Sequence, residues 1–112
     1  MIAELLALTL QASCQIELVV LGVGQDGGAP QLGRNDDPAW EDPSLAMRTV
    51  SLGVVHHETG ERFLFEATPD MREQLHDLDA VAGTVGPRAP DGIFLTHAHI
   101  GHYTGLMFLG HE

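Results

Sequence analysis

Apolar residues along this chain fall into short runs that are separated by turn-rich stretches. The run at 16–24 is rich in aliphatic residues and ends in glycine, which is typical of a buried strand. Two further runs, 49–57 and 61–68, flank a Glu-Thr-Gly connection at 58–60. This pattern predicts a β-hairpin whose glycine provides the tight turn. A shorter run at 92–96 predicts one more strand.

Between the hairpin and the last strand, apolar residues recur at helical spacing. Thr68 is a suitable N-cap, Pro69 fits the first helical position, and Asp70 complements the positive end of the helix dipole. Gly83 is suited to end the helix. The residues that share the predicted apolar face are Met71, Leu75, Leu78 and Ala82. The sequence therefore predicts a helix over 69–82.

The stretch 25–47, between the first strand and the hairpin, has a different character. It holds glycine, proline, asparagine and aspartate in several turn-like clusters and shows no apolar periodicity, so we expect a long loop. Loops of this length in compact domains are usually functional or disordered. The resulting order is strand, loop, hairpin, helix, strand, histidine-rich loop and a helix that begins at Gly101. It predicts an α/β (α+β layered) fold with antiparallel pairing in its first half.

The balance of charges limits the partners of this chain. It carries 16 acidic and five basic residues, a formal charge of −11, which argues against nucleic acid or an anionic membrane as a partner. Its single cysteine, Cys14, excludes an intrachain disulfide. The apolar segment within 1–15 is far shorter than the roughly 20 residues of a membrane span. Two interpretations of that segment stay open: an N-terminal extension of a cytoplasmic protein, or a degenerate export signal of the lipoprotein type that leads to a bacterial periplasm.

A glycine-rich segment at 22–27 matches the pattern Gly-x-Gly-x-x-Gly directly after a predicted strand. A dinucleotide-binding fingerprint also requires a helix that opens at the third glycine. Proline and turn residues follow instead, so the segment does not indicate a nucleotide site. We interpret it as a backbone loop at a strand end, close to a site of another kind.

Three histidines follow the last predicted strand within six residues: His97, His99 and His102. Imidazole is the commonest protein ligand for transition metals. Residues two apart on an extended segment point the same way, so we expect His97 and His99 to converge on one ion. His102 lies beyond the strand, where the chain turns, and approaches from another side. Structural histidines are the alternative, but the spacing favours a metal site.

This histidine segment, Thr-His-Ala-His-Ile-Gly-His-Tyr-Thr-Gly-Leu at 96–106, resembles the His-x-His-x-Asp-His signature of the metallo-β-lactamase superfamily. The sequences Val-Leu-Gly-Val-Gly-Gln-Asp-Gly-Gly-Ala-Pro at 20–30 and Phe-Glu-Ala-Thr-Pro-Asp at 65–70 are similar to the branch that contains pyrroloquinoline quinone biosynthesis protein B. The resemblance implies an αββα sandwich. Residues 16–112 would form its N-terminal half, an incomplete domain whose remaining ligands lie outside this sequence.

The resemblance also implies a role for each residue of the site. His97 and His99 match the ligands of a first zinc ion, and His102 matches a ligand of a second. The superfamily's aspartate falls at Gly101, which has no ligating side chain, so the second ion is expected to be weak or absent. The residues expected to border the pocket or to support the ligands are Asp26, Gly27, Gly28 and Asp70.

A metal-dependent hydrolase is the function that this resemblance implies. Zinc would lower the pKa of a bound water toward about 7, and the hydroxide would attack an ester, amide or phosphate-type bond of a small-molecule substrate. Two alternatives stay open: a role in cofactor biosynthesis like that of the quinone biosynthesis protein, and a non-catalytic metal-binding fragment. The sequence does not indicate the catalytic groups, the substrate, the metal or the oligomeric state. We expect the 112-residue chain alone to be inactive.

Overall fold

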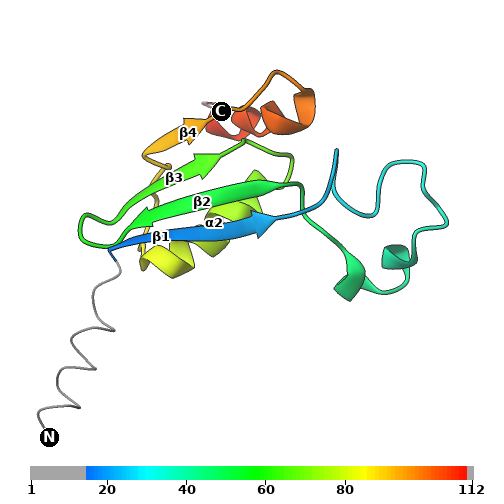
Figure 1. The fold of residues 1–112 in the computed structure, drawn as a ribbon, viewed down its shortest axis with the longest axis horizontal. Coiled ribbons are helices and arrows are strands. Elements are labelled where there is room, and N and C mark those ends of the chain that lie inside the picture. Colours follow the sequence, from blue (N-terminus) through cyan, green and yellow to red (C-terminus); the bar gives the residue numbers. More distant parts are fainter. Residues whose placement is uncertain (1–14, 111–112) are drawn as a thin grey trace, which may run out of the picture.

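A computed structural model describes residues 15–110 of the chain (Figure 1). The expectations for the N-terminal segment, including Cys14, fall outside the described residues except at Gln15. The described strands are β1 (Ile16–Gly22), β2 (Ser51–His56), β3 (Glu61–Phe65) and β4 (Gly92–Phe94). They form one sheet in the order β1-β2-β3-β4. β1 and β2 pair antiparallel, β2 and β3 form the predicted hairpin, and β3 and β4 pair in parallel.

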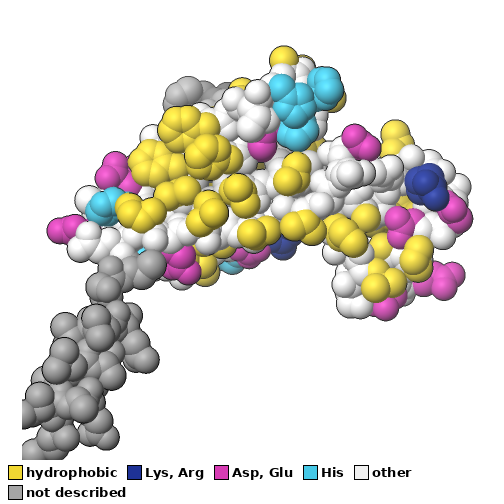
Figure 2. Space-filling view, in the orientation of Figure 1, with side chains coloured by type: hydrophobic (Ala, Val, Ile, Leu, Met, Phe, Trp, Pro, Cys, Tyr) yellow, Lys and Arg dark blue, Asp and Glu magenta, His cyan; other side chains and the backbone are white. Residues whose placement is uncertain are grey.

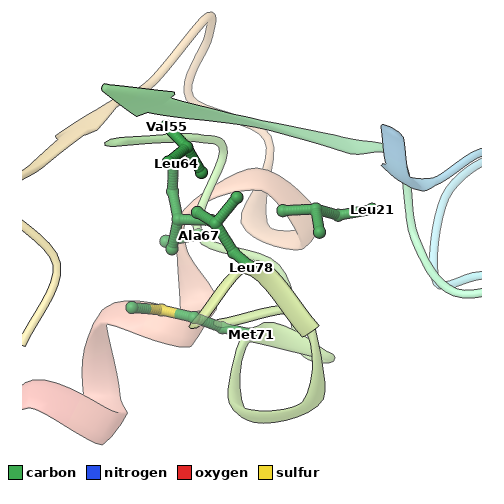
Figure 3. Close-up of a cluster of buried hydrophobic side chains, with 6 residues drawn as sticks. All are labelled: Leu21, Val55, Leu64, Ala67, Met71 and Leu78. Atoms are coloured by element: carbon green, nitrogen blue, oxygen red, sulfur yellow. The ribbon is translucent and has the colours of Figure 1, made fainter. Parts of the chain in front are cut away.

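One face of this sheet is covered by helix α2, Met71–Ala82, which crosses behind the strands in Figure 1. Figure 3 shows side chains from the sheet and the helix meeting in a small apolar core. That core consists of Leu21, Val55, Leu64, Ala67, Met71 and Leu78. Gly53 of β2 lets the helix approach closely, because a Cβ built there would lie only 2.5 Å from Cδ1 of Leu78. The packing of α2 on β2 thus requires a residue without a side chain at this point.

The helix begins two residues later than the sequence predicts. Its N-cap is Asp70 rather than Thr68, although Gly83 ends it in the left-handed conformation as expected. Thr68 is buried. Its hydroxyl accepts the backbone N–H of Asp70 and donates to Oε1 of Gln74. The expected capping residue therefore supports the first turn from outside the helix, because its hydroxyl is engaged there.

The opposite face of the sheet is apolar and lacks a covering layer among the described residues. Alternation along β3 places Phe63 and Phe65 on this face and buries Arg62 and Leu64, with Glu66 just after the strand, on the other side. Figure 2 shows the apolar side chains gathered over the strands. By register, the face is formed by Ile16, Leu18, Val20, Leu52, Val54, Phe63, Phe65 and Phe94.

A long irregular segment, 23–50, extends beyond the end of β1 in Figure 1. It contains two short 3-10 turns, η1 (Pro38–Trp40) and η2 (Pro43–Leu45), each begun by an aspartate that accepts a backbone N–H. The bridges Gly24↔Thr49 and Ala29↔Met47 bring its ends together. The expected loop is therefore confirmed. No α-helix follows the glycine pattern within this segment, so the dinucleotide fingerprint lacks its essential part.

The prediction of a helix beginning at Gly101 is wrong about the type of helix. The chain forms two 3-10 segments there, η3 (Ile100–His102) and η4 (Thr104–Leu109), separated at Tyr103. The backbone N–H of Gly105 donates to the carbonyl of Ala67 instead of continuing an α-helical ladder. This close approach to the chain after β3 explains why the turn is tight and interrupted. Within 15–110, no helix has both the length and the apolar composition needed to cross a bilayer.

Candidate metal centre

The parallel pairing of β3 and β4 brings the residues after both strands to one edge of the sheet. The N–H of Glu66, just after β3, donates to the carbonyl of Phe94 at 2.9 Å. The N–H of Ala67 donates to the carbonyl of His102, also at 2.9 Å. These two backbone bonds fix the histidine loop against the chain that leaves β3. The site therefore draws on two segments that are about 30 residues apart in sequence.

The three predicted histidines lie together at this edge. The ring centroid of His97 is 4.5 Å from that of His99 and 4.1 Å from that of His102. Oγ1 of Thr96 lies 2.8 Å from Nδ1 of His97 and so holds that ring by one nitrogen. His97 and His99 are exposed, and the side chain of His102 is mostly buried. The structure thus brings together the residues that the sequence analysis singled out as ligands.

Glu66 joins this cluster and was missed by the sequence analysis. It is 5% exposed and has a φ of 81°, which is unusual for a residue other than glycine. Its Oε1 accepts the backbone N–H of Thr96 at 2.7 Å, and its Oε2 lies 2.5 Å from Nδ1 of His102. Burial alone would raise the pKa of the Glu66 carboxyl. Hydrogen bonding from Thr96 and the neighbouring His102 outweigh it and hold that pKa below its ordinary value.

Donor atoms of the right kind for a metal ion converge here. One ligand atom from each of Glu66, His97 and His102 lies within 4.8 Å of the other two. The Oε2 of Glu66 and the Nδ1 of His102 are both buried and, despite their proximity, are not aligned as a hydrogen bond. Buried polar atoms without an aligned partner are rare and often indicate an unseen ion or water. Imidazole nitrogen and carboxylate oxygen are donors that zinc accepts, so the residues present fit such an ion.

A hollow of about 410 Å³ opens beside the histidines. Two of the expected pocket residues, Asp26 and Gly27, line it together with His99 and His102. Asp26 has a φ of 52°, and its carbonyl oxygen would be 3.1 Å from a Cβ built on Gly101. The glycine loop after β1 therefore forms a wall of the candidate site, as the sequence analysis expected of a loop at a strand end.

The other two expected pocket residues lie further from the histidines. Gly28, with a φ of 85°, packs where a Cβ would be 2.5 Å from the carbonyl oxygen of Met47. Asp70 accepts the backbone N–H of Thr49 at 2.8 Å through Oδ2. Neither lines the hollow beside the histidines. Their contacts brace the ends of segment 23–50.

The chain was compared with known proteins. No protein-family model matches it. It is 33% identical over 101 residues to coenzyme PQQ synthesis protein B of Gluconacetobacter diazotrophicus, a match that covers 84% of this chain and 33% of that protein. A crystal structure of a diphosphatase from the PhnP family aligns with a TM-score of 0.62 and 30% identity, over 84% of this chain and 34% of that one.

A crystal structure of zinc-bound PqqB from Methylobacterium extorquens aligns with a TM-score of 0.63 and 25% identity, over 82% of this chain and 35% of that one. The chain thus spans about a third of the length of these relatives. Its sheet and helix provide one β layer and one α layer of the metallo-β-lactamase fold. Within that superfamily, the chain is a relative of the branch that contains coenzyme PQQ synthesis protein B, which confirms the resemblance seen in the sequence.

Proposed function

We propose that the histidine loop binds a zinc ion and that this chain contributes to the active site of a metal-dependent hydrolase. The observation that carries the proposal is the convergence of His97, His99 and His102 at one sheet edge, beside a hollow. The names of the relatives support it, since one is a diphosphatase and another is described as zinc-bound. The substrate class that follows is a small molecule with an ester, amide or phosphate-type bond.

Each residue of the site has a separate task in this proposal. His97, His99 and His102 are the candidate ligands, and the Thr96 hydroxyl keeps Nδ1 of His97 engaged, so that its Nε2 remains available. A bound zinc ion acidifies water and supplies a nucleophile near neutral pH. The hollow lined by Asp26 and Gly27 receives the substrate next to the ligands.

Replacing His97 tests the proposal directly. The His97→Ala variant should lose stoichiometric zinc, measured by elemental analysis after gel filtration, and any hydrolysis of p-nitrophenyl esters or bis(p-nitrophenyl) phosphate. The matched control is His76→Ala, because His76 is an exposed histidine on α2. A wild-type chain that binds no zinc, or a His97→Ala variant that retains it, contradicts the proposal.

A role in quinone cofactor biosynthesis is the second candidate function. It is favoured by the match to coenzyme PQQ synthesis protein B and by Gly101, which stands where hydrolases of the superfamily carry an aspartate. When a protein that carries the whole domain is assayed, tight zinc binding without hydrolysis of either substrate class supports this role or that of a non-catalytic metal-binding module. Turnover that disappears in His97→Ala excludes both.

A further inference from the structure

Segment 23–50 has a fixed shape although it adds almost nothing to the apolar core. Ala39 is the one apolar side chain of this segment, all of which the structure describes, that is buried. Hydrogen bonds hold the segment instead. Its two 3-10 turns are each capped by an aspartate, and Ala29 and Met47 exchange two backbone bonds, of 2.8 and 2.9 Å. A loop that is ordered without core burial is typical of a segment whose shape serves binding.

These bonds shape a second hollow, of about 520 Å³. Its volume lies within the range of about 300–1,000 Å³ that is usual for small-molecule sites. The apolar side chains on its wall belong to Ala29, Pro30, Trp40, Pro43, Ala46 and Met47. Arg48 and Asp70 add polar groups, and Asp70 already accepts a backbone N–H. A hollow with several rings on its wall and few charged groups suits the apolar part of a small molecule.

The indole of Trp40 is held in place but remains open to solvent. Its Nε1–H donates to the carbonyl of Arg34 at 2.8 Å, yet the residue is 58% exposed. Leu45 and Met47 are also exposed, and Figure 2 shows apolar side chains on the surface of the part of the molecule beyond β1. Exposed apolar side chains that gather in one place often mark a binding site. Because the indole nitrogen is already paired, the ring offers an apolar face on which another flat ring can stack.

The hollow beside Trp40 adjoins the hollow beside the histidines. Gly27 lines both of them, and the consecutive residues Pro69 and Asp70 line one each. A Cβ built on Gly27 would meet nothing within 4 Å, so this residue faces open space. A ligand that fills the hollow beside the histidines can therefore extend past Gly27 toward Trp40.

We infer that the hollow beside Trp40 is a subsite for a flat aromatic ring of the substrate. The ring stacks on the Trp40 indole, and a spacer passes Gly27 to reach the bond that lies at the histidines. Burial and stacking of the ring are the sources of affinity at this subsite. This inference rests on the proposed function and narrows its substrate class to small molecules in which a spacer joins an aromatic group to the reacting bond.

Phosphonates test this inference, because they carry the charged head of a phosphate-type substrate on a carbon atom and are not hydrolysed. Calorimetric titration of the zinc-loaded protein that carries the whole domain compares phenylalkylphosphonates of increasing spacer length with alkylphosphonates of the same spacer length. At the best spacer length the ring should raise the affinity of the wild type about tenfold or more. Trp40→Ala should remove this advantage and leave the zinc content and the alkylphosphonate affinity unchanged.

Two further variants control for effects on folding. Trp40→Phe keeps a ring and should retain part of the advantage. Leu32→Ala should behave as the wild type, because Leu32 is fully exposed on the same segment and lines neither hollow. Equal affinity with and without the ring at every spacer length, or an advantage that survives in Trp40→Ala, overturns the inference alone. A protein that takes up no zinc contradicts the proposed function itself.

Discussion

The guanidinium of Arg62 on β3 pairs with the carboxylate of Asp79 on α2, and this ion pair fastens the helix to the sheet. The Arg62 side chain is fully buried, whereas that of Asp79 is 25% exposed. The Nη2 of Arg62 also donates to the carbonyls of Arg88 and Ala89. Burying the Arg62 guanidinium next to the apolar core is costly, and these partners compensate for its lost hydration.

Breaking this pair should destabilise the chain strongly. Asp79→Ala leaves the buried guanidinium with only its carbonyl partners, and we expect the free energy of unfolding to fall by about 3 kcal/mol. Urea unfolding followed by circular dichroism measures the change. The control is Asp36→Ala, which removes a partner from the exposed ion pair with Arg34 and should cost less than about 1 kcal/mol. Equal effects of the two variants would show that burial of Arg62 does not matter.

Gly53 should not accept a side chain. Gly53→Ala places a Cβ 2.5 Å from Cδ1 of Leu78, and the resulting overpacking should lower stability by about 1–3 kcal/mol. Gly27→Ala is the matched control, since a Cβ at Gly27 meets nothing within 4 Å. Thermal unfolding of both variants checks the prediction. A Gly53→Ala variant as stable as the control would mean that α2 can move away from β2 without cost.

The stabilising contribution of Asp91 to the free energy of unfolding should be lost in acid. Its carboxylate accepts the backbone N–H of Arg62 and pairs with Arg88, and these contacts hold the pKa of Asp91 below its ordinary value. A carboxyl whose pKa is lower in the folded state stabilises the fold above its unfolded pKa of about 3.9. That contribution is lost as pH falls through the folded pKa. We would measure urea unfolding from about pH 5 down to about pH 3. Over this range the free energy of unfolding should decrease less in Asp91→Asn than in the wild type.

Thr96 should strengthen metal binding through its hydroxyl alone. Thr96→Val keeps the backbone N–H that Glu66 accepts but removes the contact between Oγ1 and Nδ1 of His97. We expect zinc affinity to fall about tenfold, measured by competition with a chromophoric chelator. Thr96→Ser should retain wild-type affinity. If the serine variant is as weak as valine, the hydroxyl contact is not the cause.

The elements were predictable wherever local patterns determine them. Strand β1, the hairpin and the end of α2 at Gly83 follow from apolar runs and glycine punctuation, which act over a few residues. The 3-10 form of 100–109 was not predictable in this way. It depends on the contact between Gly105 and Ala67, which are far apart in sequence.

The candidate site was predictable in part for the same reason. Three closely spaced histidines are visible in the sequence, but Glu66 lies about 30 residues away. Its position continues the alternation of inward-facing residues along β3, so it looks like an ordinary buried residue. Only the parallel pairing of β3 with β4 and the positive φ of Glu66 turn its carboxylate toward His102. A glutamate on the buried side of the alternation, just after a predicted strand, was the signal available in the sequence.

At Glu66, backbone strain is set against the hydrogen bond that the side chain accepts. A side chain at positive φ is strained by about 1–3 kcal/mol, and glycine at the same position relieves that strain. Glycine there would also leave the backbone N–H of Thr96 without its carboxylate acceptor, which costs about 1–3 kcal/mol. The same change would remove the carboxylate from the histidines. The two free-energy changes are of similar size, so libraries screened only for stability should show little preference between glutamate and glycine at this residue.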